Sequence, residues 1–303
     1  AHPDWHIHVE GRTATESRQQ LVLDLSRADV QNYIVDAVSS VLRSAPISYV
    51  KWDMNRNITE IGSAKLSPAQ QQELPHRYIL GLYQILERIT SAFPDVLFEG
   101  CSGGGGRFDA GMLYYFPQYW TSDDTDAIER LFVQHGTSMV FPLSAMGAHV
   151  SAVPNHQLHR TTPLATRGHV AMVGQFGYEL DITKFTEEEA EAVKEQIAQY
   201  KQVREIFHRG DFYRLKSPFE GEVTAWLSVS EDQSAAALMV CTRLCRVQAP
   251  LCNVKLEGLR PAAQYRLDGT DEVYDGDYLM NVGLYFPIDR DFASKLLVFQ
   301  KLS

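Results

Sequence analysis

The sequence of 303 residues contains no block of consecutive basic residues, and its formal net charge is −10 with a pI of about 5.5. A nucleic acid or an anionic membrane surface would be repelled by this chain, so we expect neither as a partner. The sequence also lacks a run of about 18 apolar residues, the length that a membrane-spanning helix needs. An uncharged small molecule is the class of ligand that this composition favours.

Cysteine is scarce, with four residues in the whole chain. Cys101 stands alone, and Cys241, Cys245 and Cys252 lie in a segment without histidine partners, so the spacing of a zinc site is missing. Four cysteines in a chain of this length do not form a disulfide scaffold either. Free thiols in a reducing compartment are the simpler explanation, and we expect a cytoplasmic protein that uses no metal and no other cofactor.

The glycine run Gly103–Gly106 lacks the motif of a phosphate-binding loop. No Lys-Ser or Lys-Thr pair follows it, and its glycines do not have the spacing of a dinucleotide site. Four residues without a Cβ atom would instead let a sugar approach the backbone N–H groups closely.

The first 210 residues alternate between short apolar runs and amphipathic segments with apolar residues three and four positions apart. We predict helices over residues 28–44, 76–93, 127–135 and 185–208. We predict strands over residues 21–25, 47–53, 96–99, 119–122, 146–150 and 176–181. Polar or glycine residues follow the ends of these strands, which is typical of a (β/α)8 TIM barrel, and a Rossmann sheet is the competing interpretation.

The pattern changes at Gly210. Beyond it, alternating apolar residues and turn residues predict the strands 223–228, 235–241, 254–256, 264–267 and 296–299. Asp268-Gly269 and Asp275-Gly276 predict hairpin turns. We therefore expect a partial barrel domain over residues 1–210 and an antiparallel β-sandwich domain over residues 211–303.

The strand end Ser48–Arg56 is the most informative stretch of the sequence. In an extended chain Lys51, Asp53 and Asn55 lie on one side of the backbone. An ammonium and an amide beside Asp53 favour its ionised form, which a nucleophile or an electrostatic stabiliser requires. A purely structural ion pair at a strand end is the alternative interpretation.

A second acidic strand end contains Asp123 and Asp124. Glycoside hydrolysis uses two carboxyl groups, of which one is ionised and the other is protonated near neutral pH. Asp123 follows aromatic residues and neighbours another carboxylate, and both features favour its protonated form. The alternatives are that Asp123, Asp124 and Asp126 cap the next helix, or that they bind a hard cation, which would need more oxygen ligands.

Five segments of the sequence resemble the α-galactosidases of glycoside hydrolase family 36, in order and in spacing. They are Lys51–Arg56, Cys101–Asp109, Trp120–Asp126, Arg167–Met172 and Phe176–Leu180. The resemblance extends from the first residues to about residue 210 and is weaker in the C-terminal β domain. It implies a retaining exo-α-galactosidase that removes terminal α-D-galactosyl residues from oligosaccharides such as raffinose or melibiose by double displacement.

The resemblance also implies a role for individual residues. Asp53 corresponds to the nucleophile and Asp123 to the acid/base. The positions that correspond to sugar-binding residues are Arg18, Lys51, Asn55, Cys101 and Gly104.

A complete member of this family has an N-terminal β domain and two barrel strands ahead of the position where this sequence starts. If residues 21–25 are counted as strand 3, the chain contains strands 3 to 8 and cannot close a barrel, so we expect the isolated chain to hydrolyse nothing at a useful rate. The expected protein partners are further copies of this chain in a homo-oligomer, or a complementing chain that carries the missing barrel strands. The alternatives are an inactive truncated or split fragment that binds only sugar or a partner, and a related α-N-acetylgalactosaminidase or galactosyltransferase.

Overall fold

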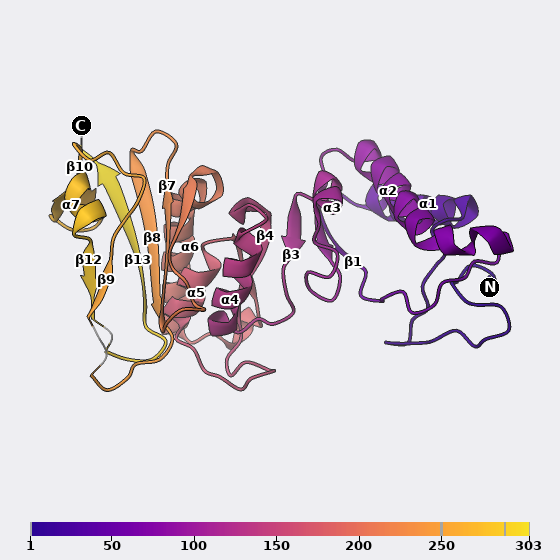
Figure 1. Ribbon diagram of the computed structural model, residues 1–303, viewed down its shortest axis with the longest axis horizontal. Coiled ribbons are helices and arrows are strands. Elements are labelled where there is room, and N and C mark those ends of the chain that lie inside the picture. Colours follow the sequence, from indigo (N-terminus) through magenta and orange to yellow (C-terminus); the bar gives the residue numbers. More distant parts are fainter. Residues whose placement is uncertain (1, 249–250, 288, 303) are drawn as a thin grey trace. The chain divides into compact units, whose positions relative to one another are not determined.

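The computed structural model describes residues 2–248, 251–287 and 289–302, and the chain divides into two compact units, Ala1–Trp120 and Thr121–Ser303 (Figure 1). Each unit combines parallel strands with helices that follow them in the sequence. The second unit also contains the antiparallel sheets of the C-terminal part.

The first unit contains three parallel strands that lie in chain order. They are β1 (Tyr49–Asp53), β2 (Leu97–Cys101) and β3 (Gln118–Trp120). The register of β1 and β2 runs from Tyr49 opposite Leu97 to Asp53 opposite Cys101, so that their carboxyl ends coincide. The helical segments of this unit are α1 (Ala28–Ser44), η1 (Pro68–Glu73), α2 (Leu74–Ala92) and α3 (Ala110–Tyr115).

The core of the first unit lies between α1, α2 and the sheet. Leu82, Ile85 and Ile89 form the buried stripe of α2, and they belong to the same core cluster as Phe98 of β2 and Phe116. Complete burial of one such side chain contributes about 1.5–3 kcal/mol to folding. The periodic apolar pattern therefore fixes which face of α2 lies against the strands.

The second unit begins with two further parallel strands, β4 (Met146–Ser151) and β5 (Gln175–Glu179). Its helices in this part are α4 (Ala127–Ser138), η2 (Leu143–Ala145), α5 (Leu164–Ala171), η3 (Ile182–Lys184) and α6 (Glu187–Arg209). Thr186 and Glu189 form a capping box at the start of α6 and satisfy backbone N–H groups that the helix leaves unpaired.

A six-stranded antiparallel sheet in the order β11-β10-β13-β8-β7-β6 follows. Its strands are β6 (Asp211–Lys216), β7 (Val223–Val229), β8 (Ala235–Thr242), β10 (Gln264–Leu267), β11 (Val273–Asp275) and β13 (Ser294–Lys301). The remaining elements are α7 (Gly276–Asn281) and a two-stranded sheet of β9 (Cys252–Val254) and β12 (Leu284–Phe286).

Strands β7 and β8 are buried at every residue. In Figure 1 the six-stranded sheet lies beside α5 and α6, and both helices contact β8. The side chains of Leu227 and Leu238 lie in a core cluster that also contains Val254 of β9 and Phe286 of β12. Because both faces of the sheet are covered, the sequence of β8 is a continuous apolar run instead of an alternating one.

Most of the predicted helices and strands are confirmed within a few residues, and α1 has the predicted bounds. The predicted strand 21–25 is wrong. Only Leu23 forms an isolated antiparallel bridge, to His6, and the N–H groups of Ile7 and Asp24 donate to the carbonyls of Val22 and Trp5 over 2.8 and 2.7 Å. Pairing with this nearby segment closes a shorter loop than parallel pairing with β1 would, which lowers its entropic cost.

The two predicted hairpin turns have different outcomes. Asp268-Gly269 forms a turn between β10 and β11, and Gly269 has a φ of +74°, which favours glycine. The prediction for Asp275-Gly276 is wrong, because Gly276 begins α7. A Cβ atom at Gly276 would lie 2.0 Å from the carbonyl oxygen of Arg260, so close backbone packing explains this glycine.

Candidate active site

The end of β1 presents two faces, as the alternation of its residues predicts. The side chains of Lys51 and Asp53 are exposed, whereas Trp52 and Met54 pack against the hydrophobic core of the first unit. Burial of the second pair fixes the direction in which the first pair points. Asp53 therefore stands at the carboxyl end of a parallel strand, where active sites of βα-repeat folds are built.

Asn55 connects Asp53 to the glycine-rich loop. Its Nδ2 donates to Oδ2 of Asp53 over 2.5 Å, and its Oδ1 accepts the backbone N–H of Gly103 over 2.6 Å. The amide thus uses both its donor and its acceptor to fix the position of the carboxylate.

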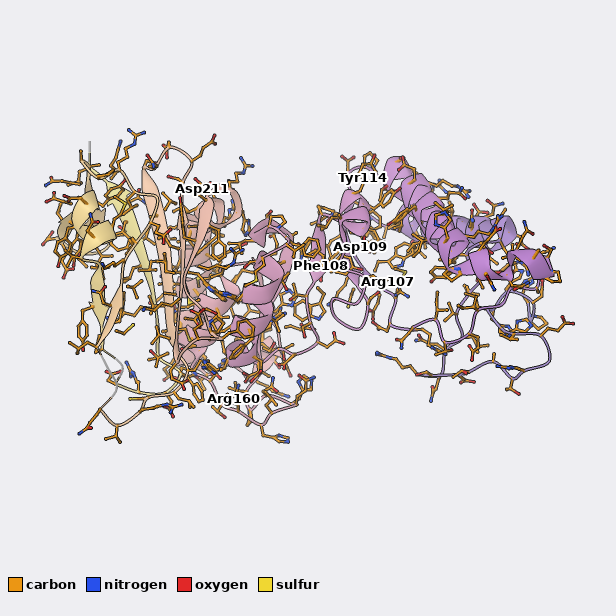
Figure 2. The ribbon with its side chains drawn as sticks, in the orientation of Figure 1. Arg107, Phe108, Asp109, Tyr114, Arg160 and Asp211 are labelled. Atoms are coloured by element: carbon orange, nitrogen blue, oxygen red, sulfur yellow. The ribbon has the colours of Figure 1, made fainter. Side chains whose placement is uncertain are left out.

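The glycine-rich loop is held against the end of β1 by a set of polar contacts. Ser102 Oγ donates to the carbonyl of Met54 over 3.0 Å, and Arg107 (labelled in Figure 2) donates to the same carbonyl and to Ser102 Oγ. Gly103 and Gly104 have φ values of +56° and +83°, the left-handed region that glycine adopts without strain. The glycine run is therefore required by the backbone of this loop, in addition to any role toward a ligand.

Cys101 lies opposite Asp53 in the register of β1 and β2, and its side chain is buried. Burial raises the pKa of the Cys101 thiol to about 11, and a hydrogen bond with the Asp53 carboxylate acts in the same direction. The thiol is consequently protonated at neutral pH and is a donor toward Asp53.

Lys51 lies between a buried carboxylate and an aromatic ring. Its Nζ is 3.8 Å from Oε1 of Glu99 and 4.6 Å from the ring centroid of Trp120. Oε2 of Glu99 accepts hydrogen bonds from the hydroxyl of Tyr49 and from Nε2 of Gln118, the latter over 2.7 Å. Glu99 is not among the site residues predicted from the sequence, although an acid directly after the apolar residues Val96-Leu-Phe is a signal that could have identified it.

The structure brings five of the predicted site residues together in the first unit. They are Lys51, Asp53, Asn55, Cys101 and Gly104. Arg18 is exposed in a turn between Ser17 and Gln20, and the described residues give its side chain no hydrogen bond or ion pair. Arg56 anchors this turn by donating to the carbonyl of Gln20 over 3.4 Å. The sugar-binding role of Arg18 stays a prediction.

Asp123 lies in the second unit, in the segment between β3 and α4, and its side chain is exposed. Asp126, not Asp123, caps α4 and accepts the N–H groups of Ile128 and Glu129 over 2.9 and 3.1 Å. Oδ1 of Asp124 accepts the N–H of Asp126 over 3.1 Å. Of the three acids, Asp126 is therefore the one whose side chain caps α4.

Arg130 links the segment that precedes α4 to strand β4. Its guanidinium donates to Thr121 Oγ1 and to the carbonyl of Gly147, the latter over 2.8 Å. Burial lowers the pKa of Arg130 to about 10, while the charges of Asp124 and Glu179 act in the opposite direction. At the ends of β4 and β5, Nδ1 of His149 lies 3.1 Å from Oε2 of Glu179.

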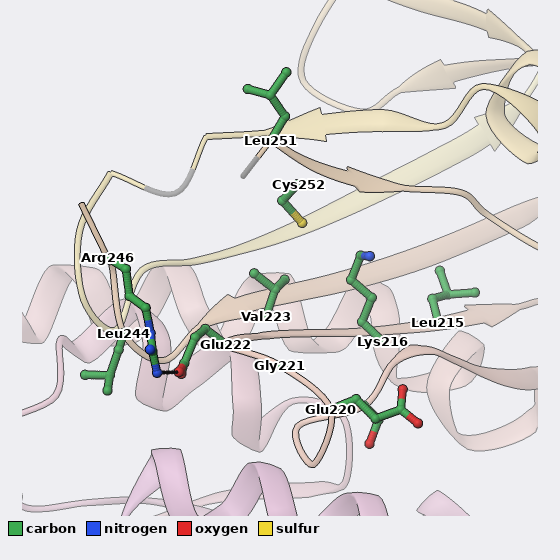
Figure 3. Close-up of a pocket in the computed structure, with 11 residues that line it drawn as sticks. Leu215, Lys216, Glu220, Gly221, Glu222, Val223, Leu244, Arg246, Leu251 and Cys252 are labelled. Atoms are coloured by element: carbon green, nitrogen blue, oxygen red, sulfur yellow. Dashed lines mark hydrogen bonds and ion pairs between the residues drawn. The ribbon is translucent and has the colours of Figure 1, made fainter. Parts of the chain in front are cut away.

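A cavity of about 400 Å³ lies in the C-terminal β domain, between the segment after β6 and the segment before β9 (Figure 3). Glu222 in this cavity is paired with Arg246 over 2.7 Å and with Arg243 over 3.2 Å. Both carboxylate oxygens of Glu222 are thus engaged in ion pairs with guanidinium groups. The cavity therefore offers a less suitable pair of carboxyl groups for acid/base chemistry than the strand ends do.

Within the described ranges, no group of three or more His, Cys, Asp or Glu side chains is arranged to hold a metal ion. In the same ranges, no helix combines the length and the apolar character needed to cross a membrane.

Comparison with known proteins identifies the family. The Melibiase family model matches residues 1–210, and the model of the glycosyl hydrolase family 36 C-terminal domain matches residues 223–299. α-Galactosidase AgaA of Geobacillus stearothermophilus is 57% identical over 296 residues, which are 97% of this chain and 40% of that protein. α-Galactosidase 1 of Pediococcus pentosaceus is 47% identical over 303 residues, 100% of this chain and 41% of that protein.

Solved structures agree with this result. The crystal structure of AgaA matches with a TM-score of 0.97 and 56% identity, and covers 99% of this chain and 42% of that one. A crystal structure of an AgaA variant in complex with raffinose has the same TM-score. The chain thus spans well under half the length of the curated relatives it matches.

The fold is the one that part of a barrel glycoside hydrolase adopts in the solved relatives. Within that class the chain belongs to glycoside hydrolase family 36, the family that contains these α-galactosidases. The predicted fold class, part of a TIM barrel followed by an antiparallel β domain, is confirmed.

Proposed function

We propose that this chain forms the catalytic and C-terminal part of a retaining exo-α-galactosidase. The proposed reaction is hydrolysis of terminal α-D-galactosyl residues of oligosaccharides such as raffinose or melibiose. The principal support is the position of Asp53 at the end of β1, where Asn55 donates to its carboxylate and the Lys51 ammonium lies on the same face. Membership of family 36 and the raffinose complex of the Geobacillus relative support the substrate class.

In the proposed first step, Asp53 attacks the anomeric carbon while Asp123 donates its proton to the glycosidic oxygen. The bond between the anomeric carbon and that oxygen breaks, and a β-galactosyl-enzyme ester forms on Asp53. In the second step, the Asp123 carboxylate takes a proton from water, and the water oxygen displaces Asp53 to give α-galactose. For this mechanism the two carboxyl groups must lie roughly 5–5.5 Å apart in the complete barrel.

The proposed sugar contacts use neutral and cationic donors around the nucleophile. Lys51 has three N–H donors for sugar hydroxyls, and Asn55 and Cys101 add polar groups next to the Asp53 carboxylate. Gly104 leaves room for the sugar because it has no Cβ atom. We assign Arg18 to the same group of contacts on the basis of the family resemblance.

We further propose that residues 1–210 form the barrel part and residues 211–303 the β-sandwich domain, and that a further segment or a complementing chain provides the missing barrel strands. The outer edge of β1 has unpaired backbone groups that such a strand would satisfy, because β1 is the first strand of the parallel sheet among the described residues. All four cysteines are free thiols, which fits a cytoplasmic location.

The stereochemistry of the product tests the proposed function. The chain, assembled with the strands that complete its barrel, is given p-nitrophenyl α-galactoside, and the first galactose released is observed by proton NMR before mutarotation. We expect α-galactose, and β-galactose as the first product would contradict the retaining mechanism. Parallel assays with the α-N-acetylgalactosaminide distinguish the related activity, because only an enzyme with additional space beside the 2-hydroxyl accepts that substrate.

A further inference from the structure

Glu99 is a deeply buried acid of the first unit, with an exposed fraction of 0%, a value that Asp24 shares. It lies in the interior of β2, between an apolar run and the glycine-rich loop. Burial of a carboxylate costs free energy unless the carboxylate is paired and hydrogen-bonded. The Glu99 side chain therefore needs partners that replace its lost solvation.

The two carboxylate oxygens of Glu99 have different surroundings. Oε2 accepts the hydroxyl of Tyr49 and the amide of Gln118, which fix the carboxylate in place. Oε1 has no hydrogen-bond partner among the described residues, and the Nζ of Lys51 lies 3.8 Å away. This distance exceeds that of a direct hydrogen bond, so the interaction is a charge–charge attraction between a buried carboxylate and a partly exposed ammonium.

The register of the sheet relates this pair to the proposed nucleophile. Lys51 lies opposite Glu99, and Asp53 lies opposite Cys101, two residues further along both strands. Because alternate residues of a strand share one face, the Lys51–Glu99 pair lies directly below the Asp53–Cys101 pair. On its other side the Lys51 ammonium faces the ring of Trp120, which is itself buried.

We propose that Glu99 is a positioning residue that acts through Lys51. The carboxylate of Glu99 and the ring of Trp120 together hold the Lys51 ammonium at the position where it contacts the galactosyl hydroxyls. Glu99 does not touch the sugar, because its side chain is fully buried. The inference rests on the proposed function, since it assigns Lys51 to the sugar.

A double-mutant cycle in the assembled α-galactosidase tests this inference, with kcat and KM measured on p-nitrophenyl α-galactoside. Glu99→Gln preserves the size of the side chain and an oxygen that can accept from Tyr49 and Gln118, but removes the charge. We expect it to raise KM about ten-fold with kcat changed less than about three-fold, because the Lys51 contact is made in both the ground and transition states. In a Lys51→Met background the same substitution should add no further loss.

A control variant separates positioning from support of the fold. Asp29→Asn removes one charge from the ion pair between Asp29 and Arg27 at the start of α1. We expect its KM to be within about two-fold of the parent, since this substitution does not alter the charge facing Lys51. Thermal unfolding of each variant identifies loss of folded protein, which would lower the apparent kcat without changing KM.

Equal effects of Glu99→Gln in the parent and Lys51→Met backgrounds would overturn the inference. A fall in kcat alone, in a Glu99→Gln variant that unfolds at the same temperature as the parent, would also overturn it. Either result with an active parent leaves the proposed function intact. A parent that releases no galactose overturns the proposed function, and the positioning role falls with it.

Discussion

The side chain of Asn55 donates a 2.5 Å hydrogen bond to the carboxylate of Asp53, two residues before it on the same face of the strand end. The other end of the Asn55 amide accepts the N–H of Gly103, so this one side chain aligns the proposed nucleophile with the glycine-rich loop. A carboxylate held by an amide in this way needs no reorganisation before it attacks.

We therefore expect Asn55→Ala to lower kcat about 100-fold, because displacement of a reacting group by about 1 Å has an effect of that size. The measurement is steady-state hydrolysis of p-nitrophenyl α-galactoside by the assembled enzyme. Asn57→Ala is the matched control, since Asn57 is a nearby exposed asparagine, and its rate should equal that of the parent. A kcat for Asn55→Ala within a factor of two of the parent would show that the amide does not orient Asp53.

Asp53→Ala should abolish turnover, because no other group can form the ester intermediate. Azide should restore product formation by entering the space left by the carboxylate, and the product should be β-galactosyl azide. Asp36→Asn, at an exposed position on α1, is the control and should retain full activity without responding to azide. Normal turnover by Asp53→Ala would show that the nucleophile is another residue.

Asp123 and Asp126 should respond in opposite ways to replacement by alanine. Asp126→Ala removes the cap of α4 and one of the two acidic partners of Arg160, and should lower the free energy of unfolding by about 1–2 kcal/mol. Asp123→Ala should leave stability closer to that of the parent, because the side chain is exposed, but should eliminate activity on substrates with poor leaving groups. Urea unfolding and hydrolysis of raffinose measure the two effects. Asp123→Ala with parental activity on raffinose would contradict the acid/base assignment.

The isolated chain should show no measurable hydrolysis of p-nitrophenyl α-galactoside, because its described residues form five parallel strands and a closed (β/α)8 barrel needs about eight. Addition of a segment with the missing strands should restore activity and increase thermal stability, since pairing satisfies the edge of β1. Gel filtration of the mixture shows whether the two pieces associate. Full activity of the chain alone would contradict the prediction.

The free energy of unfolding should depend on pH through His169. Burial lowers the pKa of His169 from its ordinary value of 6.5 to about 4, and Nδ1 of His169 lies 2.8 Å from Ser294 Oγ. The unfolded chain therefore binds a proton that the folded chain does not, so the free energy of unfolding should fall as pH decreases from about 6.5 to 4. The lowered pKa of His169 should reduce the free energy of unfolding at about pH 4 by at most about 3 kcal/mol.

The measurement is urea unfolding of the parent and of His169→Gln across that range. The variant should lose less stability toward acid pH, because glutamine does not titrate. An identical acid dependence of parent and variant would show that other groups determine it.

Local patterns in the sequence were sufficient for much of this fold. The apolar spacing of residues 28–44 predicted α1 with its observed bounds, and the alternation around Asp53 predicted which side chains of β1 lie outside the core. Both features depend on periodicity within one element, which neighbouring residues specify directly. The family motifs identified the family for the same reason, since each is a contiguous segment.

The pairing of Glu99 with Lys51, and the links from Asn55 and Arg107 across the glycine-rich loop, join residues that are far apart in the chain. No local pattern contains these contacts, because they depend on the register in which β1 and β2 pair. The same limit explains the failed strand at residues 21–25, whose apolar pattern is compatible with a barrel strand. Its backbone pairs with residues 5–7 instead, and that choice depends on which partner strands are present and on the entropy of closing each loop.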